Sequence, residues 1–397
     1  MNDNVVIAGA GPVGLMCALG LARQGVTVDI FEAEQDVVYS PRAIGYAWPI
    51  LKALESWGLL DDMMAAGHVE HERCWRVFAT GETIVFDHSA IAGDTSHPYS
   101  LTLGQHLIAR VLLAHLAREP NVRVHWSHAV AGLTERGDRI VVAVNGPDGA
   151  IEVDASWVIA ADGGRSTVRK AIGLPLEGFT WERRFVATDV YFDFEGHGWQ
   201  SCYLIDPEFG TVVYKLNEDR LWRVTYAEDR RLPVESALER MPAFMARILP
   251  GDGRYELSHW SPYNMHQRTA PTYRKGRVLL AGDAAHLTNP TSGFGLMGGL
   301  YDAFLLTEAL GAVVTGKGDD SLLDRYAAAR RSVYLDVTSP VSTESLRLCF
   351  DSRNEERLAW DLRLLRERMT DPQAMHKFLS IPRALETPSL LTGKSWA

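Results

Sequence analysis

Val5-Val-Ile-Ala-Gly9-Ala-Gly11-Pro-Val-Gly14 begins with a continuous apolar run and ends in a glycine-rich turn. An uninterrupted apolar run is typical of a strand buried on both faces of a parallel sheet. The residues that follow, Leu15 to Arg23, have helical character, and Val26 to Phe31 form a second apolar run that ends at Glu32. This order predicts a βαβ unit.

The glycine spacing G-x-G-x-x-G has a physical meaning in that context. The first glycine permits a tight turn, the second lets backbone approach a pyrophosphate, and the third lets helix and strand pack closely. The start of the helix offers free N–H groups and partial positive charge, and an acid at the end of the second strand can accept from ribose hydroxyls. A glycine-rich turn without ligand is the alternative. The predicted dinucleotide contacts are Gly9, Gly11, Pro12, Val13, Gly14, Glu32 and Ala33.

Composition excludes several classes of protein. A chain of 397 residues predicts two or three domains, and 46% hydrophobic with 23% charged residues is ordinary for a globular protein. A net charge of −10 without a long basic run argues against nucleic-acid binding as the main task.

The cysteines and the N-terminus bear on compartment and metal content. Cys17, Cys74, Cys202 and Cys349 lie far apart, which excludes a zinc ribbon and favours a reducing compartment. The N-terminus lacks the positive region of a signal peptide, and glycines interrupt the apolar stretch from residue 5 to 22. We predict a soluble cytoplasmic protein with no metal site and no membrane contact.

The rest of the chain alternates between strand and helix patterns. Short strands are expected from 122 to 161, including a hairpin around Gly146 to Gly149 and the buried strand Trp157 to Ala160. The stretch from about 179 to 226 is β-rich, Arg277 to Ala281 is again a buried strand, and helices are expected at 300–312, 322–334 and 355–369. This layout predicts an α/β nucleotide-binding domain split by a β-rich insertion, with a helical C-terminus.

Three further patterns have weaker support. Gly293-Phe-Gly295-Leu-Met-Gly298 repeats the glycine spacing without a preceding strand, so it could place backbone amides near a ligand but is not a second Rossmann turn. The stretch from Gly311 to Gly318 lacks the Ser or Thr of a P-loop and is expected to be a helix C-terminal loop. His68-Val-Glu-His71-Glu72 could hold a metal, but a solvated loop is expected.

Two segments place an aspartate directly after a buried strand. They are Val158-Ile-Ala-Ala-Asp162-Gly163-Gly-Arg-Ser-Thr-Val-Arg169 and Arg277-Val-Leu-Leu-Ala-Gly282-Asp283-Ala-Ala-His286. Each aspartate can accept hydrogen bonds from sugar-like hydroxyls or cap a helix. Following a Rossmann turn in this order, the segments form a specific set.

The set resembles the class A flavoprotein aromatic monooxygenases, the group of para-hydroxybenzoate hydroxylase. The resemblance covers about residues 3 to 340, is strong at the three motifs and is weak between 179 and 268. It implies a Rossmann-like FAD-binding domain of the glutathione-reductase type at 1–175 and 271–340. A β-rich substrate domain at 176–270 and a helical segment at 341–397 complete the predicted division.

The resemblance also assigns roles to single residues. It implies that Arg42 contacts the flavin, that Gln105 lies near the ribityl chain, and that Asp162 serves FAD and nicotinamide binding with Arg169 as its support. Further implied FAD contacts are Gly282, Asp283 at the ribityl hydroxyls, Pro290 beside the ring, and the amides of Gly295, Leu296 and Met297. Many relatives have Gln and Asn where this chain has Phe294 and Met297, so only backbone contacts could survive there. His286 is expected to be structural.

The implied reaction uses NADH or NADPH to reduce FAD. Reduced flavin then reacts with O₂ to give a C4a-hydroperoxyflavin, which delivers one oxygen atom to a small phenol, hydroxypyridine or aminoaromatic. The acids Glu32, Glu34 and Asp36 slightly favour NADH. The catalytic base is unassigned, with Pro290, Tyr203, Tyr214 and Arg223 as candidates for catalytic roles. Candidates for substrate binding are Tyr46, Trp48, Tyr203, Tyr214, Arg223 and Tyr226, with Lys215 and Asn217 weaker.

Two other functions stay open at this point. An FAD-dependent halogenase or dehydrogenase could use the same scaffold, although no Trp-x-Trp-x-Ile-Pro segment occurs. A non-catalytic FAD-binding redox sensor is the second, although neither a basic run nor an appended partner domain is evident. The charged stretch from Glu355 to Met369 could support a homodimer or cover the core.

Overall fold

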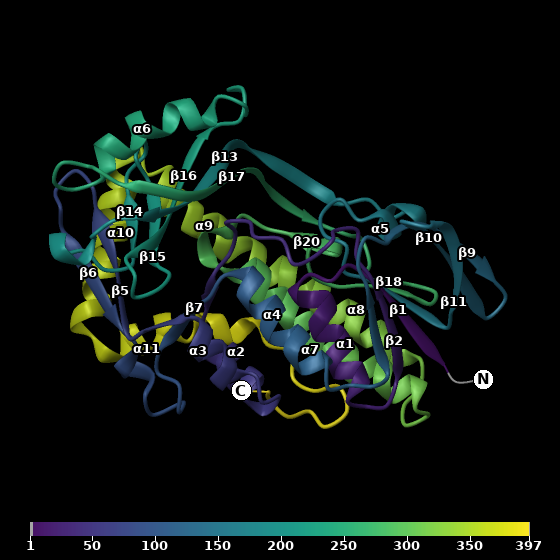
Figure 1. Ribbon diagram of the computed structural model, residues 1–397. Helices are drawn as coiled ribbons and strands as arrows, with labels where there is room; N and C mark the ends of the chain where they lie inside the picture. Colours follow the sequence, from purple (N-terminus) through teal and green to yellow (C-terminus); the bar gives the residue numbers. More distant parts are fainter. Residues whose placement is uncertain (1–2, 397) are drawn as a thin grey trace.

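The computed structural model describes residues 3–396 and has two lobes, each built on one large sheet (Figure 1). The sheet of the first lobe has the order β18-β19-β12-β1-β2-β8. All its pairings are parallel except that of β18 with β19. Its strands are β1 (Asn4–Ala8), β2 (Thr27–Phe31), β8 (Val122–His125), β12 (Trp157–Ala160), β18 (Arg274–Lys275) and β19 (Val278–Leu280).

The predicted βαβ unit is confirmed, with helix α1 (Pro12–Ala22) between β1 and β2. Ala8 is in register with Phe31 on one side and with Ala160 on the other. The carboxyl ends of parallel strands meet at one edge of a sheet, where open α/β folds bind ligands. The three motifs of the sequence therefore converge at this edge.

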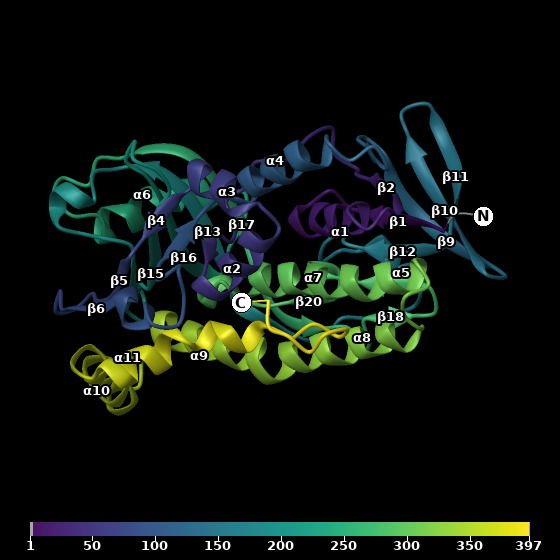
Figure 2. The same ribbon diagram turned by 90° about the horizontal axis from the view of Figure 1, so that it is seen from below.

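Four long helices cover this sheet (Figure 2). They are α1, α4 (Gln105–Leu116), α7 (Phe294–Val314) and α8 (Ser321–Val333). Helix α7 is long and apolar enough to cross a membrane, but 83% of its most apolar window is buried inside the protein, which accounts for its composition. It begins earlier than the predicted residue 300 and ends at Val314, so the loop expected from Gly311 to Gly318 is confirmed only for residues 315–318.

A small antiparallel sheet lies at the end of the molecule opposite to the C-terminal helices (Figures 1 and 2). It consists of β9 (Ala129–Arg136), β10 (Arg139–Gly146) and β11 (Gly149–Ala155), with α5 (Thr167–Ala171) packed on β9. The hairpin predicted around Gly146 to Gly149 is confirmed by the β10–β11 pairing.

The second lobe contains an eight-stranded sheet in the order β20-β17-β13-β16-β15-β14-β5-β6. The strands β5 and β6 come from residues 72–87, far upstream of the stretch predicted to be β-rich. A three-stranded sheet, β3-β7-β4, holds the segment between the lobes. The strands are β3 (Gly45–Tyr46), β4 (His68–Glu70), β5 (Glu72–Val77), β6 (Thr83–Asp87), β7 (Ser100–Thr102), β13 (Glu177–Tyr191), β14 (Cys202–Ile205), β15 (Thr211–Lys215), β16 (Leu221–Asp229), β17 (Glu256–Thr269) and β20 (His286–Leu287).

Helices cover both faces of this second sheet. Apolar side chains of α6 (Ala237–Ile248) pack with Val186, Trp222 and Val224 on one face. The opposite face, called here the inner face, is covered by α9 (Ser339–Phe350), α10 (Glu355–Thr370) and α11 (Pro372–Leu379). The remaining helical elements are α2 (Trp48–Ser56), α3 (Leu60–Ala66), η1 (His88–Ile91), η2 (Glu195–His197), η3 (Gly282–Ala284), η4 (Pro290–Ser292), η5 (Tyr334–Thr338) and η6 (Ile381–Leu385).

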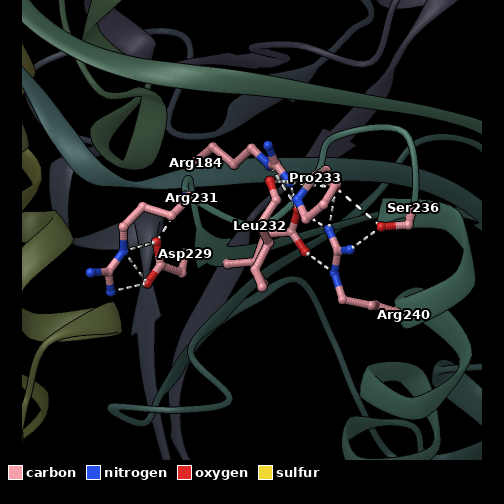
Figure 3. Close-up of polar contacts among 8 residues, drawn as sticks. Arg184, Asp229, Arg231, Leu232, Pro233, Ser236 and Arg240 are labelled. Carbon is pink, nitrogen blue, oxygen red and sulfur yellow. Dashed lines mark hydrogen bonds and ion pairs between the residues drawn. The ribbon is translucent and has the colours of Figure 1, made fainter.

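The loop between β16 and α6 is held by two arginines on either side of the Leu232 and Pro233 carbonyls (Figure 3). Arg184 donates to both carbonyls, and Arg240 donates to that of Pro233. Both arginines also donate to the buried carboxylate of Glu228, from Arg184 Nε at 2.7 Å and Arg240 Nε at 2.9 Å. One acid thus fixes the edge of the second lobe.

The expectation of a solvated loop at His68 to Glu72 is wrong. The segment forms β4 and the start of β5, and Glu70 is only 6% exposed. A strand in a sheet turns alternate side chains inward, so Glu70 points into the protein. Within residues 3–396, no group of His, Cys, Asp and Glu side chains could hold a metal ion.

Candidate active site

The glycine turn is shaped by close contacts that exclude side chains at two of its three glycines. Gly9 has φ +99°, and a Cβ on Gly14 would lie 2.0 Å from the carbonyl oxygen of Gly9. At Gly11 a Cβ would meet nothing within 4 Å. The backbone at Gly11 is therefore open to a ligand, while Gly9 and Gly14 hold the turn against the helix.

The start of α1 has the properties of an anion site. Its N-cap, Gly11, provides no side-chain cap, and the first turn holds no acidic residue. First-turn N–H groups have no partner within a helix, so they and the helix dipole favour a phosphate. Beside them, Glu32 Oε2 accepts from the Ala10 amide at 2.7 Å, which holds the carboxylate against the turn.

Asp162 caps α5 and keeps one oxygen free. Its Oδ2 accepts from the amides of Thr167 at 2.7 Å and Val168 at 3.2 Å, whereas Oδ1 is buried without a hydrogen-bond partner among the described residues. Arg169 donates to the carbonyls of Ala284 (2.9 Å) and Gly164 (3.0 Å) and thereby joins the second motif to the third. Its predicted supporting role agrees with these contacts.

Asp283 lies at the same edge, in η3. Its side chain is exposed and has no hydrogen bond within residues 3–396, so both oxygens can accept from hydroxyls. Surrounding protein atoms raise the pKa of Asp283, although His286 and Arg42 act in the opposite direction. The open glycine turn, the uncapped helix and the free carboxylate oxygens of Asp162 and Asp283 fit the phosphates and hydroxyls of FAD.

His286 is structural, as expected. It is buried, and its Nε2 lies 2.8 Å from Asp302 Oδ2. Asp302 also accepts from the Gly282 amide at 2.9 Å and from Arg330 at 2.7 Å. Burial alone would raise the pKa of Asp302, but His286 and Arg330 lower it to about 2. This buried cluster holds the segment from Gly282 to His286, which contains Asp283, in place.

A cavity of about 590 Å³ lies between the inner face, η4 and the C-terminal helices. At one end its wall includes Arg42, Pro290, Gly293, Phe294 and Met297, the segment predicted to face the flavin. Gly295 and Leu296 stand in the first turn of α7 but not on the wall. Gln105 begins α4, also off the wall. Contacts of all these residues with FAD stay predictions.

Alternation along the strands decides which predicted substrate residues reach the cavity. Tyr203, Tyr214 and Arg223 lie on the inner face and line it, together with Trp48. Tyr226 does not, and that prediction is wrong. Three residues along β16 from Arg223, it has the opposite direction and stacks on Phe244 of α6 with ring centres 4.0 Å apart.

The prediction that Tyr46 contacts the substrate is also wrong. It is fully buried in the core of the first lobe, and its hydroxyl has no hydrogen-bond partner within residues 3–396, whereas its neighbours Gly45 and Ala47 line the cavity. Tyr46 pairs with Leu101 of β7, and the alternation of β3 turns it away from the cavity. The weaker candidates Lys215 and Asn217 are not on the wall either.

Arg223 lines the cavity but is already engaged by protein groups. Its Nη2 donates to Asp189 Oδ2 at 2.8 Å, its Nε donates to Asp189 Oδ1, and Nη1 donates to the carbonyl of Arg42. Tyr39 donates to the same aspartate at 2.6 Å. These contacts indicate that Arg223 positions the Arg42 loop.

Sequence reasoning missed a polar group at the far end of the cavity. Arg73 and His88 are on the wall, and Glu70 lies behind Arg73. Burial, with a smaller effect from Arg73, lowers the pKa of His88 from 6.5 to about 4. The available signal was that Arg73 has the same parity on β5 as Trp75 and Val77, which are both buried.

Residues 2–340 match a protein-family model described as an FAD binding domain. The chain belongs to this FAD-binding family. It is 39% identical over 392 residues to 6-hydroxy-3-succinoylpyridine 3-monooxygenase of Pseudomonas putida, covering 96% of this chain and 100% of that one. It is 40% identical over 382 residues to para-nitrophenol 4-monooxygenase of a Pseudomonas species, covering 95% and 94%.

The structural comparison agrees with the sequence comparison. The crystal structure of p-nitrophenol 4-monooxygenase from Pseudomonas putida matches with a TM-score of 0.93 and 39% identity, over 97% of this chain and 98% of that one. The predicted class, the flavin-dependent aromatic monooxygenases, is confirmed, as are its cofactor FAD and the predicted fold. Enzymes of this class use FAD as cofactor, NADH or NADPH as reductant and O₂ as oxidant.

Proposed function

We propose that the chain hydroxylates a small aromatic ring that carries a hydroxyl group and, opposite it, an electron-withdrawing substituent. Both relatives named above have such a substrate in their names, a 6-hydroxy-3-succinoylpyridine and a para-nitrophenol. The position of oxygenation in each name, 3 and 4, is the carbon opposite the hydroxyl. A similarity of about 40% over nearly the whole chain supports the same substrate class here.

One observation carries the proposal most directly. A single cavity joins the segment predicted to face the flavin, at Pro290 and Met297, to phenolic and guanidinium donors at Tyr203, Tyr214 and Arg73. Its volume of about 590 Å³ is in the range of small-molecule sites. A substituted single ring fits this space with its polar groups at the two ends.

The chain's own residues bind and orient the reactants. Gly9, Gly11, Gly14 and Asp283 would hold FAD, which supplies two-electron transfer and activation of O₂ when bound. Apolar wall residues such as Trp75, Phe86 and Phe378 exclude water from the cavity, which strengthens polar contacts within it. Tyr214 donates to Tyr203 at 2.8 Å, so these hydroxyls form an ordered pair at the wall.

The electron donor is proposed to be NADH or NADPH, taken up transiently. The acidic residues after β2 slightly favour NADH. Arg110 donates to Asp36 at 2.9 Å, and its positive charge weakens that preference. A cytoplasmic location, a homodimer and the domain limits at residues 175, 270 and 340 stay predictions.

A substrate panel tests the proposal. Purified protein loaded with FAD is given 4-nitrophenol, 6-hydroxynicotinate, 4-hydroxybenzoate and 4-aminobenzoate with NADH or NADPH, and nucleotide oxidation and product mass are recorded. We expect a para-substituted hydroxyarene to accelerate nucleotide oxidation and to yield an oxygenated product. A halogenated product, or no product and no acceleration with any compound, would overturn the proposal.

A further inference from the structure

An ion pair lies behind the wall at the far end of the cavity. Arg73 Nε donates to Glu70 Oε2 at 2.7 Å, and their side chains are 11% and 5% exposed. Glu70 also accepts from Ser201 and, at 3.3 Å, from Thr102. The carboxylate therefore accepts from three donors, on β5, on β7 and at Ser201 just before β14.

The guanidinium of Arg73 has one nitrogen, Nη2, without a hydrogen-bond partner among the described residues. This nitrogen is buried, whereas Nη1 donates to the Tyr214 hydroxyl at 3.1 Å. A buried donor without a partner costs free energy, so such a group in a cavity wall points to a ligand acceptor. Arg73 lines the cavity.

Tyr203 adds a second donor at the same place. Its hydroxyl accepts from Tyr214, which leaves its own proton free to donate. Nearby on the wall, His88 Nδ1 lies 2.8 Å from the His71 carbonyl. A carbonyl can only accept, so Nδ1 carries the proton and Nε2 of the neutral ring is an acceptor.

The charges in this group sum to zero. Arg73 is cancelled by Glu70, and burial keeps His88 neutral near pH 7. A carboxylate bound here would leave an uncompensated buried negative charge, which is unfavourable. A phenol enters neutral, accepts from Arg73 and Tyr203, and can donate its proton to an acceptor such as His88.

We propose that Arg73 and Tyr203 bind the hydroxyl oxygen of the substrate, and that Glu70 makes this subsite select a hydroxyl over a carboxylate. The inference rests on the proposed function, since it concerns how a hydroxyarene lies in the cavity. The strand order places β5 and β20 near opposite edges of the sheet, so this subsite is distant from the predicted flavin side. The opposite end of the ring then faces Pro290.

The test compares two ligands that differ only in the group under study, 4-nitrophenol and 4-nitrobenzoate. Their dissociation constants are measured by calorimetry on FAD-loaded protein for wild type, Glu70→Gln, Glu70→Gln/Arg73→Met and Arg76→Met. The double variant avoids leaving a buried carboxylate unpaired, so it is the safer variant for folding. Arg76 is the matched control, because it lies on the same strand but off the cavity wall, over the ring of Trp199.

We expect wild type to bind 4-nitrophenol more tightly than 4-nitrobenzoate. Glu70→Gln should shift the ratio of the two constants toward 4-nitrobenzoate by at least about tenfold, the double variant should weaken 4-nitrophenol by about tenfold or more, and Arg76→Met should change neither. The inference would be overturned by an unchanged ratio in Glu70→Gln or by an unchanged dissociation constant for 4-nitrophenol in the double variant. It would also be overturned if wild type preferred 4-nitrobenzoate or bound neither ligand.

The result is separable from that of the substrate panel. If the binding constants follow the expected pattern but wild type forms no oxygenated product, the subsite stands and the proposed function fails. If products form but the constants do not change, the function stands and the role of Glu70 and Arg73 is wrong. Absorbance of bound 4-nitrophenol gives a second readout, since wild type should bind the neutral phenol, whereas Glu70→Gln, which leaves the charge of Arg73 uncancelled, should favour nitrophenolate.

Discussion

The guanidinium of Arg169 donates to the carbonyl oxygen of Ala284 at 2.9 Å and so ties together two segments that are 115 residues apart in the chain. The first segment contains Asp162 and the second contains Asp283, the two acids with carboxylate oxygens free for a ligand. The arginine is 4% exposed, so this tie lies inside the protein. Both the affinity for FAD and the stability of the fold should therefore depend on Arg169.

Replacing Arg169 by Met should weaken FAD binding and the fold. The buried carbonyl of Ala284 and the partly buried carbonyl of Gly164 lose their donor, at a cost of about 2–4 kcal/mol in the free energy of unfolding. Urea unfolding and FAD fluorescence titration measure the two effects. Lys170→Met, at an exposed neighbour, should change neither, and a stable Arg169→Met that binds FAD normally would refute the structural role.

The second and third glycines of the turn should respond differently to alanine. Gly14→Ala forces a Cβ to within 2.0 Å of the Gly9 carbonyl oxygen, so it should lose more than about 2 kcal/mol of stability along with FAD binding. Gly11→Ala has open space and should keep its unfolding midpoint, yet bind FAD at least about tenfold more weakly because the methyl group occupies the phosphate approach. Normal FAD affinity in Gly11→Ala would place the phosphates elsewhere.

His88 should make the protein acid-sensitive. Its pKa is lowered to about 4 in the fold, mainly by burial, against 6.5 when unfolded. The unfolded state then binds more protons between these values, so stability is full above pH 6.5 and falls by about 3 kcal/mol as pH drops to 4. His88→Asn, which keeps a donor for the His71 carbonyl, should flatten this part of the urea-unfolding profile. An unchanged slope would show that other groups cause it.

The stability of the fold should depend more on Glu228, the acid shared by Arg184 and Arg240, than on its neighbour Asp229. Glu228→Ala leaves the buried Arg184 without its carboxylate and should cost about 3–5 kcal/mol in the free energy of unfolding. Asp229, which pairs with the exposed Arg231 in the same view (Figure 3), is the control, and Asp229→Ala should leave the unfolding midpoint unchanged. Equal effects of the two substitutions would mean that burial of the Glu228 network contributes nothing.

The first lobe was predictable because local patterns and tertiary contacts agree there. The apolar run at Val5 and the strand at Trp157 are buried on both faces, so their sequences show it without knowledge of neighbours. The motifs around Asp162 and Asp283 follow such strands, which places them at the same edge.

The substrate cavity was much less predictable. Strand β5 joins the second sheet from more than 100 residues upstream of β14, and no local pattern reports such a pairing. Arg73, Glu70 and His88 were therefore missed. Tyr226 could have been excluded from sequence, because it and Arg223 are an odd number of residues apart on one strand and must face opposite ways.

The central claim is that FAD and O₂ act on a hydroxyarene in the cavity between the two lobes. The most direct measurement is the mass of the product formed under ¹⁸O₂ from the panel compound that most accelerates nucleotide oxidation, with the reaction quenched at once. We predict that the product contains one labelled oxygen atom and that no product forms without O₂ or FAD. A product that carries oxygen only from water, or turnover that continues without O₂, would contradict it.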